Sequence, residues 1–251
     1  MHRPLENHVA WVTGSSTGLG KAIAVALGDA GAQVAFNYQR NRSRAEATFA
    51  AYEATGAKGL LVRGDVTDPD EVNRMQREIA EKLGPVDILV PNATPDQPQR
   101  PIEEYDWAFY QTMLDYFVKS PFLLARACLP EMKRRKWGRI VNIGSEAFQR
   151  GVGNFSAYVA AKGGQTGWTR SLATELAPFG ITVNLVAPGW IPVERHENDP
   201  PEMKAAYLGA IPAKRWGTPA DVAAAVVYLA SDGAAFVTGQ TLAVNGGLTV
   251  S

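Results

Sequence analysis

The sequence predicts an α/β fold in which one parallel β-sheet is covered by helices on both faces. Strand and helix signals alternate along the whole chain of 251 residues, and neither a linker nor an internal repeat interrupts them. The strand-like segments are short apolar runs, which are typical of parallel strands buried on both faces, and the segments between them have helical apolar spacing. A single domain spanning residues 1–251 is therefore the economical architecture.

A glycine-rich loop follows the first predicted strand. The apolar segment HVAWVTG, residues 8–14, runs into a loop from Gly14 to Gly20 and then into the apolar-periodic helix KAIAVALGDAG. Glycines permit a tight turn and let backbone N–H groups approach a phosphate closely, and the helix N-terminus adds partial positive charge. Such a loop alone is often an ordinary turn, but the strand and helix around it favour a dinucleotide site. The residues expected to contact the dinucleotide here are Gly14, Ser16, Thr17, Gly18 and Leu19.

The end of the second predicted strand indicates which dinucleotide is bound. The strand AQVAFNYQ is followed by Arg40, Arg42 and a helix from about Ser43, and no acidic residue lies between Asn37 and Arg42. An acid at this place usually binds the ribose hydroxyls, whereas arginine offers a bidentate fork to a 2′-phosphate. The sequence therefore favours NADP(H), with Tyr38 and Arg40 in the site. NAD(H) remains the alternative if both arginines are only solvated loop residues.

The third and fourth predicted strands each end in a polar residue. In GLLVRGDV, Asp65 is expected to accept a hydrogen bond from the adenine amino group, beside Val66, unless it caps the helix that begins at about Pro69. Asn92 ends the strand VDILVPNA, where an amide can bond backbone groups opened at the crevice of the sheet. A polar loop and a long helix with several aromatic residues then lead to Arg135, and we interpret those aromatics as packing or subunit contacts.

Ser145, Tyr158 and Lys162 are the candidate catalytic residues. Ser145 ends the apolar run RIVNIGS, so we expect it at the carboxyl edge of a parallel strand, where ligands bind in such sheets. Tyr158 and Lys162 are four residues apart in a predicted helix, so their side chains project from one face. A nearby cation lowers the pKa of a phenol, which lets Tyr158 exchange a proton with a carbonyl oxygen held by Ser145. The alternative is a half-buried ring beneath a solvated lysine.

The last third of the chain contains a predicted lid. The sixth strand, GITVNLVAPG, opens onto a proline-rich segment from Trp190 to Trp216, which we expect to be a mobile substrate lid at about residues 190–216. The segments TPADVAAAVVYLASD and GQTLAVNGG then supply a last helix and a last strand. The predicted order of elements after the sixth strand is therefore a lid, one helix and one strand.

Composition excludes several classes of protein. The 25 basic and 25 acidic residues cancel, so no global charge favours a nucleic-acid partner or an anionic membrane. The single cysteine, Cys128, excludes an internal disulfide and a multi-cysteine metal site. The N-terminus lacks the apolar core of a signal peptide, and no run of 18 apolar residues is present. We therefore expect a soluble, cytoplasmic protein that binds no metal, no nucleic acid and no membrane.

Several motifs in the right order resemble those of the short-chain dehydrogenase/reductase family. The resemblance extends from Val9 to Gly247 and rests on the loop from Thr13 to Gly20, Asp65-Val66, Asn92-Ala93, Ser145, Tyr158-x-x-x-Lys162 and Pro188-Gly189. It implies a single-domain Rossmann sheet of seven strands and a homotetramer or homodimer. Among members of the family, the chain is most similar to the 3-oxoacyl-(acyl-carrier-protein) reductase-like group.

The resemblance also implies a role for each site residue. Tyr158 is the implied acid–base, Ser145 the residue that binds the substrate oxygen, and Lys162 the residue that binds the nicotinamide ribose and lowers the tyrosine pKa. Further implied cofactor contacts are Pro188, Gly189 and Ile191. The implied reaction is hydride transfer between NADP(H), or NAD(H), and a small-molecule carbonyl or secondary alcohol.

Three positions depart from the pattern of the family. The usual Asn-Asn-Ala-Gly is Pro91-Asn92-Ala93-Thr94 here, which replaces a conformationally permissive glycine. Phe117 stands at about the place of a helical asparagine that many members use in catalysis, and Val193 replaces a frequent threonine. These changes put the rate and the proton supply in question more than cofactor binding. Two alternative functions therefore stay open, a dinucleotide-binding protein with little turnover and a non-redox member of the family.

The substrate is the least determined part of the prediction. Acyl thioesters, sugars and small cyclic ketones all remain open, because the residues that select a substrate lie in variable loops. An apolar or ring-shaped substrate is suggested by four aromatic residues, which the alternative interpretation assigns to packing: Phe148, Phe155, Trp190 and Trp216. A basic patch for an acidic carrier protein is suggested by Arg100, Arg150 and Arg195, which are otherwise surface charges.

Overall fold

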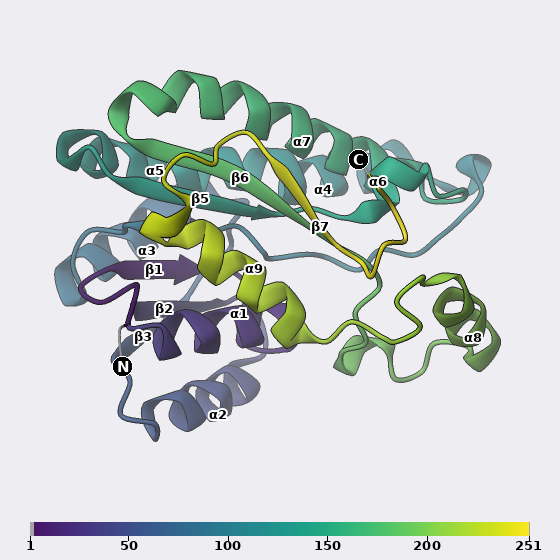
Figure 1. The fold of residues 1–251 in the computed structure, drawn as a ribbon, viewed down its shortest axis with the longest axis horizontal. Helices are drawn as coiled ribbons and strands as arrows, with labels where there is room; N and C mark the ends of the chain where they lie inside the picture. Colours follow the sequence, from purple (N-terminus) through teal and green to yellow (C-terminus); the bar gives the residue numbers. More distant parts are fainter. Residues whose placement is uncertain (1–2, 251) are drawn as a thin grey trace.

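The computed structural model describes residues 3–250, which contain one seven-stranded sheet in the order β3-β2-β1-β4-β5-β6-β7 (Figure 1). Every pair of neighbouring strands is parallel. The predicted α/β class with about seven parallel strands is therefore confirmed. The strands are β1 (Val9–Val12), β2 (Gln33–Tyr38), β3 (Gly59–Arg63), β4 (Ile88–Val90), β5 (Gly138–Ile143), β6 (Ile181–Pro188) and β7 (Thr241–Val244).

Helices cover both faces of this sheet (Figure 1). On one face, Ile23 of α1 and Val226 of α9 belong to the same buried cluster as residues of the central strands. On the other face, Met75 of α3, Leu124 of α5 and Leu176 of α7 form a second buried cluster. The helices are α1 (Gly18–Asp29), α2 (Arg42–Glu53), α3 (Pro69–Lys82), α4 (Trp107–Leu114), α5 (Ser120–Arg135), α6 (Glu146–Arg150), α7 (Ser156–Leu176), α8 (Pro201–Ala210) and α9 (Pro219–Ala230).

The strand order places a crevice beside β1. The chain builds outward from β1 through β2 to β3, and then returns to place β4 on the other side of β1. At such a reversal the connections leave in opposite directions, so the carboxyl ends of β1 and β4 are not covered by a crossover. The topology therefore opens a ligand crevice where the glycine loop, Asn92 and Ser145 follow their strands.

The predicted long helix ending at Arg135 is interrupted. Helices α4 and α5 are separated by a π-helical segment, Asp115–Lys119, in which the Ser120 N–H bonds to the carbonyl of Asp115. Pro121 is the second residue of α5. A proline lacks the backbone N–H, and its ring clashes with the carbonyl four residues earlier, here that of Phe117. The backbone hydrogen bonds between α4 and α5 are consequently irregular, and the π-helical segment contains one residue more than a regular α-helical turn would.

Three short helical elements near the site were not predicted. Helix α6 (Glu146–Arg150) follows Ser145, whose hydroxyl accepts a hydrogen bond from the Ala147 N–H at 3.1 Å, and it ends at Gly151 with φ of 59°. The predicted lid contains a 3₁₀ helix, Glu194–His196, and helix α8, which lies beside the main body of the molecule (Figure 1).

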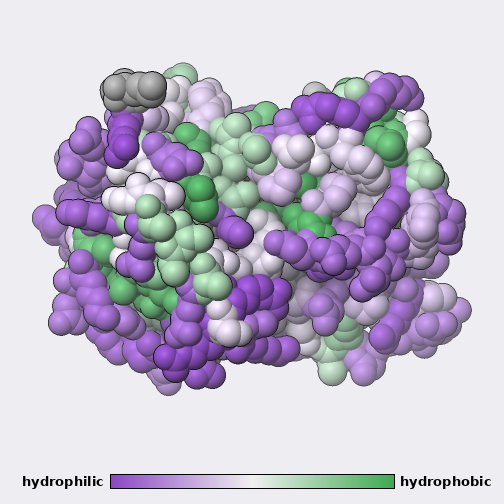
Figure 2. Space-filling model, turned by 90° about the horizontal axis from the view of Figure 1, so that it is seen from below, coloured by the Kyte–Doolittle hydropathy of each residue, from purple (hydrophilic) through white to green (hydrophobic). Residues whose placement is uncertain are grey.

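None of the helices in residues 3–250 is both long and apolar enough to span a membrane. Hydrophilic residues cover most of the face seen from below (Figure 2).

Candidate active site

The carboxyl ends of the central strands surround a cleft of about 800 Å³. Most of the predicted site residues line it, although they come from six strand ends and two helices. The cleft thus brings together residues that are up to 181 positions apart in the chain, from Gly14 to Arg195. The predicted residues along its wall are Gly14, Ser16, Thr17, Gly18, Leu19, Tyr38, Arg40, Val66, Asn92, Ser145, Tyr158, Lys162, Pro188 and Gly189.

The glycine loop is shaped to receive a phosphate. Gly14 has a φ of +62°, and a Cβ atom there would lie 2.8 Å from the Cα of Ala93. A Cβ at Gly20 would lie 2.3 Å from the Gly14 carbonyl oxygen, so the loop must stay free of side chains. Thr17 caps α1 in an extended conformation but makes no capping hydrogen bond with its side chain, which leaves the first N–H groups of the helix for a ligand. These observations fit the pyrophosphate of a dinucleotide.

Two asparagines fasten this loop to the ends of neighbouring strands. The Asn92 amide donates to the carbonyl of Thr13 at 2.8 Å and to that of Gly14 at 3.2 Å, which is the kind of backbone contact expected of an amide at this strand end. The Asn37 amide oxygen accepts from the Gly14 N–H at 3.1 Å, and its nitrogen donates to the Gly64 carbonyl at 3.1 Å. The sequence pattern marked residue 37 only by the absence of an acid, so the structural role of Asn37 was missed.

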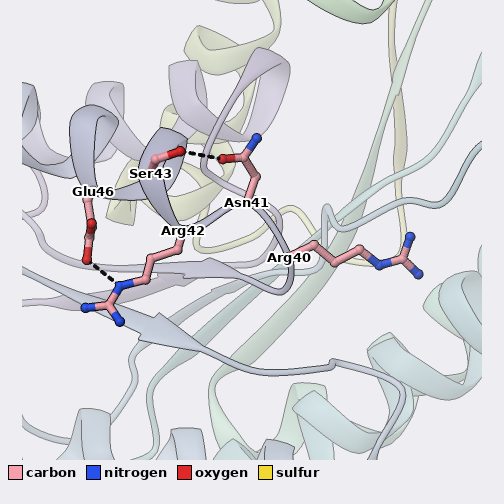
Figure 3. Close-up of a pocket in the computed structure, with 5 residues that line it drawn as sticks. All are labelled: Arg40, Asn41, Arg42, Ser43 and Glu46. Carbon is pink, nitrogen blue, oxygen red and sulfur yellow. Dashed lines mark hydrogen bonds and ion pairs between the residues drawn. The ribbon is translucent and has the colours of Figure 1, made fainter.

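The arginines after β2 point in opposite directions (Figure 3). Arg40 lines the cleft, whereas Arg42 bonds to Glu46 at 2.7 Å on the outer side of α2. Asn41 caps α2 by accepting from the Arg44 N–H at 3.0 Å, and this places Arg44 along the cleft instead. Of the two arginines considered from the sequence, Arg42 is therefore the solvated one, because its guanidinium bonds to Glu46 one turn along the same helix. Arg44 was missed because it lies inside the helix.

Asp65 and Ile191 are the two predicted cofactor residues that do not line the cleft. The carboxylate of Asp65 accepts from Gln39 Nε2 at 2.6 Å and from the Thr67 N–H at 2.8 Å, so it closes a turn before α3. The Tyr116 hydroxyl extends this chain by donating to Gln39 Oε1 at 3.4 Å. Ile191 is buried, and its side chain packs where a Cβ of Gly217 would lie. Gln39 and Tyr116 line the cleft in their place.

Tyr158 lies on α7 near Ser145, in the expected arrangement. The ring of Phe155 stacks on that of Tyr158 with centroids 4.5 Å apart, and the ring of Phe117 meets it edge-on at 5.3 Å. Burial raises the pKa of the Tyr158 phenol, and this outweighs the hydrogen-bonding influence of Ser145 and the positive charge of Arg195, both of which lower it. The expected lowering of the tyrosine pKa is thus not the net effect here, because the two aromatic rings desolvate the phenol.

Lys162 is buried directly beneath the phenol. Its ammonium donates to the carbonyl of Ile143 at 2.6 Å and to Gln165 Oε1 at 3.1 Å, and it lies 3.8 Å from the centre of the Phe117 ring. Burial lowers the pKa of Lys162 well below its usual value, and the charge of Arg195 adds to this. Phe117 therefore contacts both members of the pair, and it stabilises the ammonium through a cation–π contact instead of an amide hydrogen bond.

The residues proposed to select a substrate are only partly in the cleft. In the described part of the chain, none of the four suggested aromatics lines the cleft, and Trp190 packs against Trp216 with centroids 5.7 Å apart. Of the suggested basic residues, Arg195 lines the cleft, whereas Arg150 bonds to Glu146 at 3.1 Å. The cleft is instead lined by both polar and apolar residues, and its polar lining residues include Thr94, Asp96, Gln97, Ser145, Glu194 and Arg195.

A nucleotide-binding crevice that ends at a serine, a tyrosine and a lysine defines a class of dinucleotide-dependent enzymes, and comparison with known proteins identifies the family. The family described as enoyl-(acyl carrier protein) reductase matches residues 14–249. The 3-oxoacyl-[acyl-carrier-protein] reductase FabG of Staphylococcus aureus is 39% identical over 241 residues, 95% of this chain and 97% of that protein. Nodulation protein G of Azospirillum brasilense is 39% identical over 246 residues, 97% of this chain and 99% of that protein.

A solved structure supports the same assignment. The crystal structure of a putative gluconate dehydrogenase from Agrobacterium tumefaciens has a TM-score of 0.94 and 35% sequence identity, and the match covers 100% of both chains. The chain therefore belongs to the short-chain dehydrogenase/reductase family. Within that family it is an NAD(P)-dependent oxidoreductase whose relatives act on small-molecule carbonyls or alcohols.

Proposed function

We propose that the protein is an NADP(H)-dependent carbonyl reductase or alcohol dehydrogenase in which Tyr158 transfers the proton. The observation that carries this proposal is the position of Tyr158, Ser145 and Lys162 at one end of the cleft that contains the glycine loop. When bound, the nicotinamide cofactor supplies or accepts the hydride. The loop residues Gly14, Ser16, Thr17, Gly18 and Leu19 would hold it, with Tyr38, Val66, Asn92, Pro188 and Gly189.

Each catalytic residue has a distinct task in this proposal. The Tyr158 phenol, whose pKa is raised by burial, donates its proton to the carbonyl oxygen during reduction. The Ser145 hydroxyl, fixed by the Ala147 N–H, donates a hydrogen bond to the same oxygen. Lys162 holds positive charge beneath the phenol and favours the phenolate that forms. The Phe155 and Phe117 rings exclude water from this proton transfer.

The preference for NADP(H) rests on Arg40 and Arg44. Both line the cleft at the end of β2, where no acid is present to bind ribose hydroxyls, and arginine suits a phosphate dianion. Fluorescence titration with NADPH and NADH tests this directly. We expect Arg40→Ala and Arg44→Ala each to weaken NADPH binding about tenfold or more with little change for NADH. Arg42→Ala is the matched control and should behave as the wild type, and equal NADH and NADPH affinity in the wild type would reject the preference.

We propose a polar, hydroxylated carbonyl or alcohol as the substrate, in preference to a long acyl chain. Three observations support this: the hydrogen-bonding side chains of Thr94, Gln97 and Ser145 in the cleft, the position of Trp190 and Trp216 outside it, and the similarity to the structure of a putative gluconate dehydrogenase. The relatives named 3-oxoacyl reductases support the acyl thioester as the competing substrate. Comparing kcat/KM for gluconate oxidation and for reduction of a 3-oxoacyl thioester decides between them, and a higher value for the thioester would overturn our choice.

One observation favours the alternative of a cofactor-binding protein with little turnover. Phe117 covers the Lys162 ammonium at 3.8 Å and offers no hydrogen bond for the proton pathway. If the ring limits the reaction, Phe117→Asn should raise kcat about tenfold or more, which would support the low-turnover function. A fall in kcat for this variant, with nucleotide binding retained, would show that the aromatic ring is part of an efficient site. A non-redox reaction would appear as product formation with no change in nicotinamide absorbance.

We also propose a homotetramer or homodimer in the cytoplasm, with residues 190–216 acting as the substrate lid. Phe236 is fully exposed and Leu242 is partly exposed near β7, the edge strand, which is the pattern of a surface that pairs with another chain. Light scattering of the purified protein would measure the mass, and a monomer would reject the oligomer. The free, buried thiol of Cys128 fits a reducing compartment.

A further inference from the structure

The helix of the lid is attached to the rest of the molecule mainly through Tyr207. Helix α8 has no buried side chain, so apolar packing contributes little to its position. The Tyr207 hydroxyl donates to the carboxylate of Glu146 and accepts from the Trp190 N–H at 2.7 Å. It thereby joins three segments: α8, the turn that follows β6, and α6.

The Tyr207 ring fits tightly into the turn after β6. It stacks on Trp216 with centroids 5.7 Å apart and an interplanar angle of 10°, and Trp190 meets it at 72°. A Cβ atom at Gly189 would lie 2.7 Å from the Tyr207 hydroxyl oxygen, so the turn admits this hydroxyl only because residue 189 is glycine. The contact therefore places the hydroxyl against the Pro188-Gly189 wall of the cleft.

Glu146 connects this hydroxyl to the catalytic serine. It is the residue after Ser145 and the first residue of α6, and only 4% of it is exposed. One carboxylate oxygen accepts from Tyr207 and from Arg150 at 3.1 Å, while the other is buried without a hydrogen-bond partner in residues 3–250. A buried carboxylate is costly unless it is paired, so loss of the Tyr207 bond would favour a shift of α6 toward solvent. The Ser145 hydroxyl is bonded to the Ala147 N–H of this same helix.

We infer that Tyr207 and Glu146 are positioning residues, which hold the Ser145 hydroxyl in its reactive place only while the lid is docked. This rests on the proposed role of Ser145 in binding the substrate oxygen. The hydroxyl of Tyr207 fixes α6 through Glu146, and α6 in turn fixes Ser145. Closure of the lid is then coupled to the alignment of Ser145. The coupling passes through the hydrogen bond between Tyr207 and Glu146, which are 61 positions apart in the chain.

Hydrogen exchange tests the inference without an assay of activity. Tyr207→Phe keeps the stacked ring and removes both hydrogen bonds of the hydroxyl. We expect exchange to rise about five- to tenfold both in α8 and at the Ala147 amide, the size expected for one buried hydrogen bond. Tyr228→Phe, on the exposed side of α9, is the matched control and should leave both unchanged. Glu146→Gln retains an acceptor for Tyr207 and should stay near the wild type, whereas Glu146→Ala should resemble Tyr207→Phe.

Kinetics test whether the effect passes through Ser145. We expect Tyr207→Phe to lower kcat/KM about tenfold in the wild-type background and to have almost no further effect in Ser145→Ala. The inference is wrong if Ala147 exchanges at the wild-type rate in Tyr207→Phe, or if Tyr207→Phe lowers kcat/KM equally in both backgrounds. If the wild type binds nucleotide but turns over no carbonyl, the proposed function fails, and the exchange at Ala147 alone decides the inference.

Discussion

The glycine loop and the lid bound the same cleft but are held in different ways. The loop is fixed by Asn92, which donates to the carbonyls of Thr13 and Gly14, and by Asn37, which accepts from the Gly14 N–H. Side chains at Gly14 and Gly20 would collide with backbone atoms. The lid instead stacks aromatic rings around one hydroxyl, that of Tyr207, and its helix buries no side chain. We infer that the loop is a rigid receptor for the nucleotide and the lid a part that can separate from it.

This difference predicts where substitutions act. Changes near the loop and the catalytic helix should alter chemistry or nucleotide binding directly, because those residues contact the ligands. Substitutions in the lid should act indirectly, by changing the position of residues that contact the ligands. Their effects should therefore be smaller and should depend on the lid being docked. The three predictions that follow are arranged from the largest expected effect to the smallest.

Lys162→Met should have the largest effect. The ammonium bonds to Ile143 and Gln165 beneath Tyr158, so its loss removes the charge that favours the phenolate. We expect kcat to fall about 10³-fold, the size typical of a lost acid–base contribution. Steady-state kinetics with saturating nucleotide measures this. Retention of more than a tenth of wild-type kcat would mean that the charge of Lys162 is not used in the reaction.

Gly20→Ala and Gly209→Ala compare the loop with the lid at one helical glycine in each. A Cβ at Gly20 would lie 2.3 Å from the Gly14 carbonyl oxygen and 2.4 Å from Asn92 Nδ2, whereas nothing lies within 4 Å at Gly209. We expect Gly20→Ala to lower the free energy of unfolding by about 1–3 kcal/mol and to weaken nucleotide binding. Gly209→Ala should raise that free energy by up to about 1 kcal/mol through helix propensity. Chemical denaturation measures both, and equal destabilisation by the two would remove the contrast.

The smallest effect is expected where the lid rejoins the main body at α9. Hydrogen bonds from Arg215, and to a smaller extent those from Thr218, hold the pKa of Asp221 well below its usual value of 3.8. Because the pKa is lower in the folded state, the stabilisation is complete above the usual value and is lost as the pH falls below it. Asp221→Asn should lower the free energy of unfolding at pH 7 by less than about 1 kcal/mol, since Arg215 is exposed and Asp221 partly exposed, so that solvent screens the pair. Denaturation at several pH values should show the difference from wild type shrinking below 3.8, and a difference that widens there would contradict the assignment.

The features that local sequence patterns determine were predicted well. The seven strands, the glycine loop and the spacing of Tyr158 and Lys162 depend on residues within a few positions of one another. Arg44 was not considered as a cleft residue, because its position depends on where Asn41 caps the helix, and the sequence pattern does not show that. The α/β class needed only the alternation of elements, and the whole cleft follows from the order of the strands.

The features that long-range contacts determine could not be predicted. The interruption at Asp115–Lys119 places Phe117 over Lys162, although the two are 45 positions apart, and no periodic pattern shows this contact. The bond between Glu146 and Tyr207 likewise joins segments that are separate in the sequence. The sequence left Trp190 and Trp216 open between substrate binding and packing, and the structure packs them against each other and against Tyr207.

The most direct test of the account is to measure turnover and NADPH binding on the same sample of Tyr158→Phe. The variant keeps the ring that packs between Phe155 and Phe117 and removes only the hydroxyl. We predict that kcat falls by at least about 10²-fold while the dissociation constant for NADPH stays within about threefold of the wild type. Unchanged turnover in the variant would contradict the central claim that this phenol transfers the proton in a cleft built for the nucleotide.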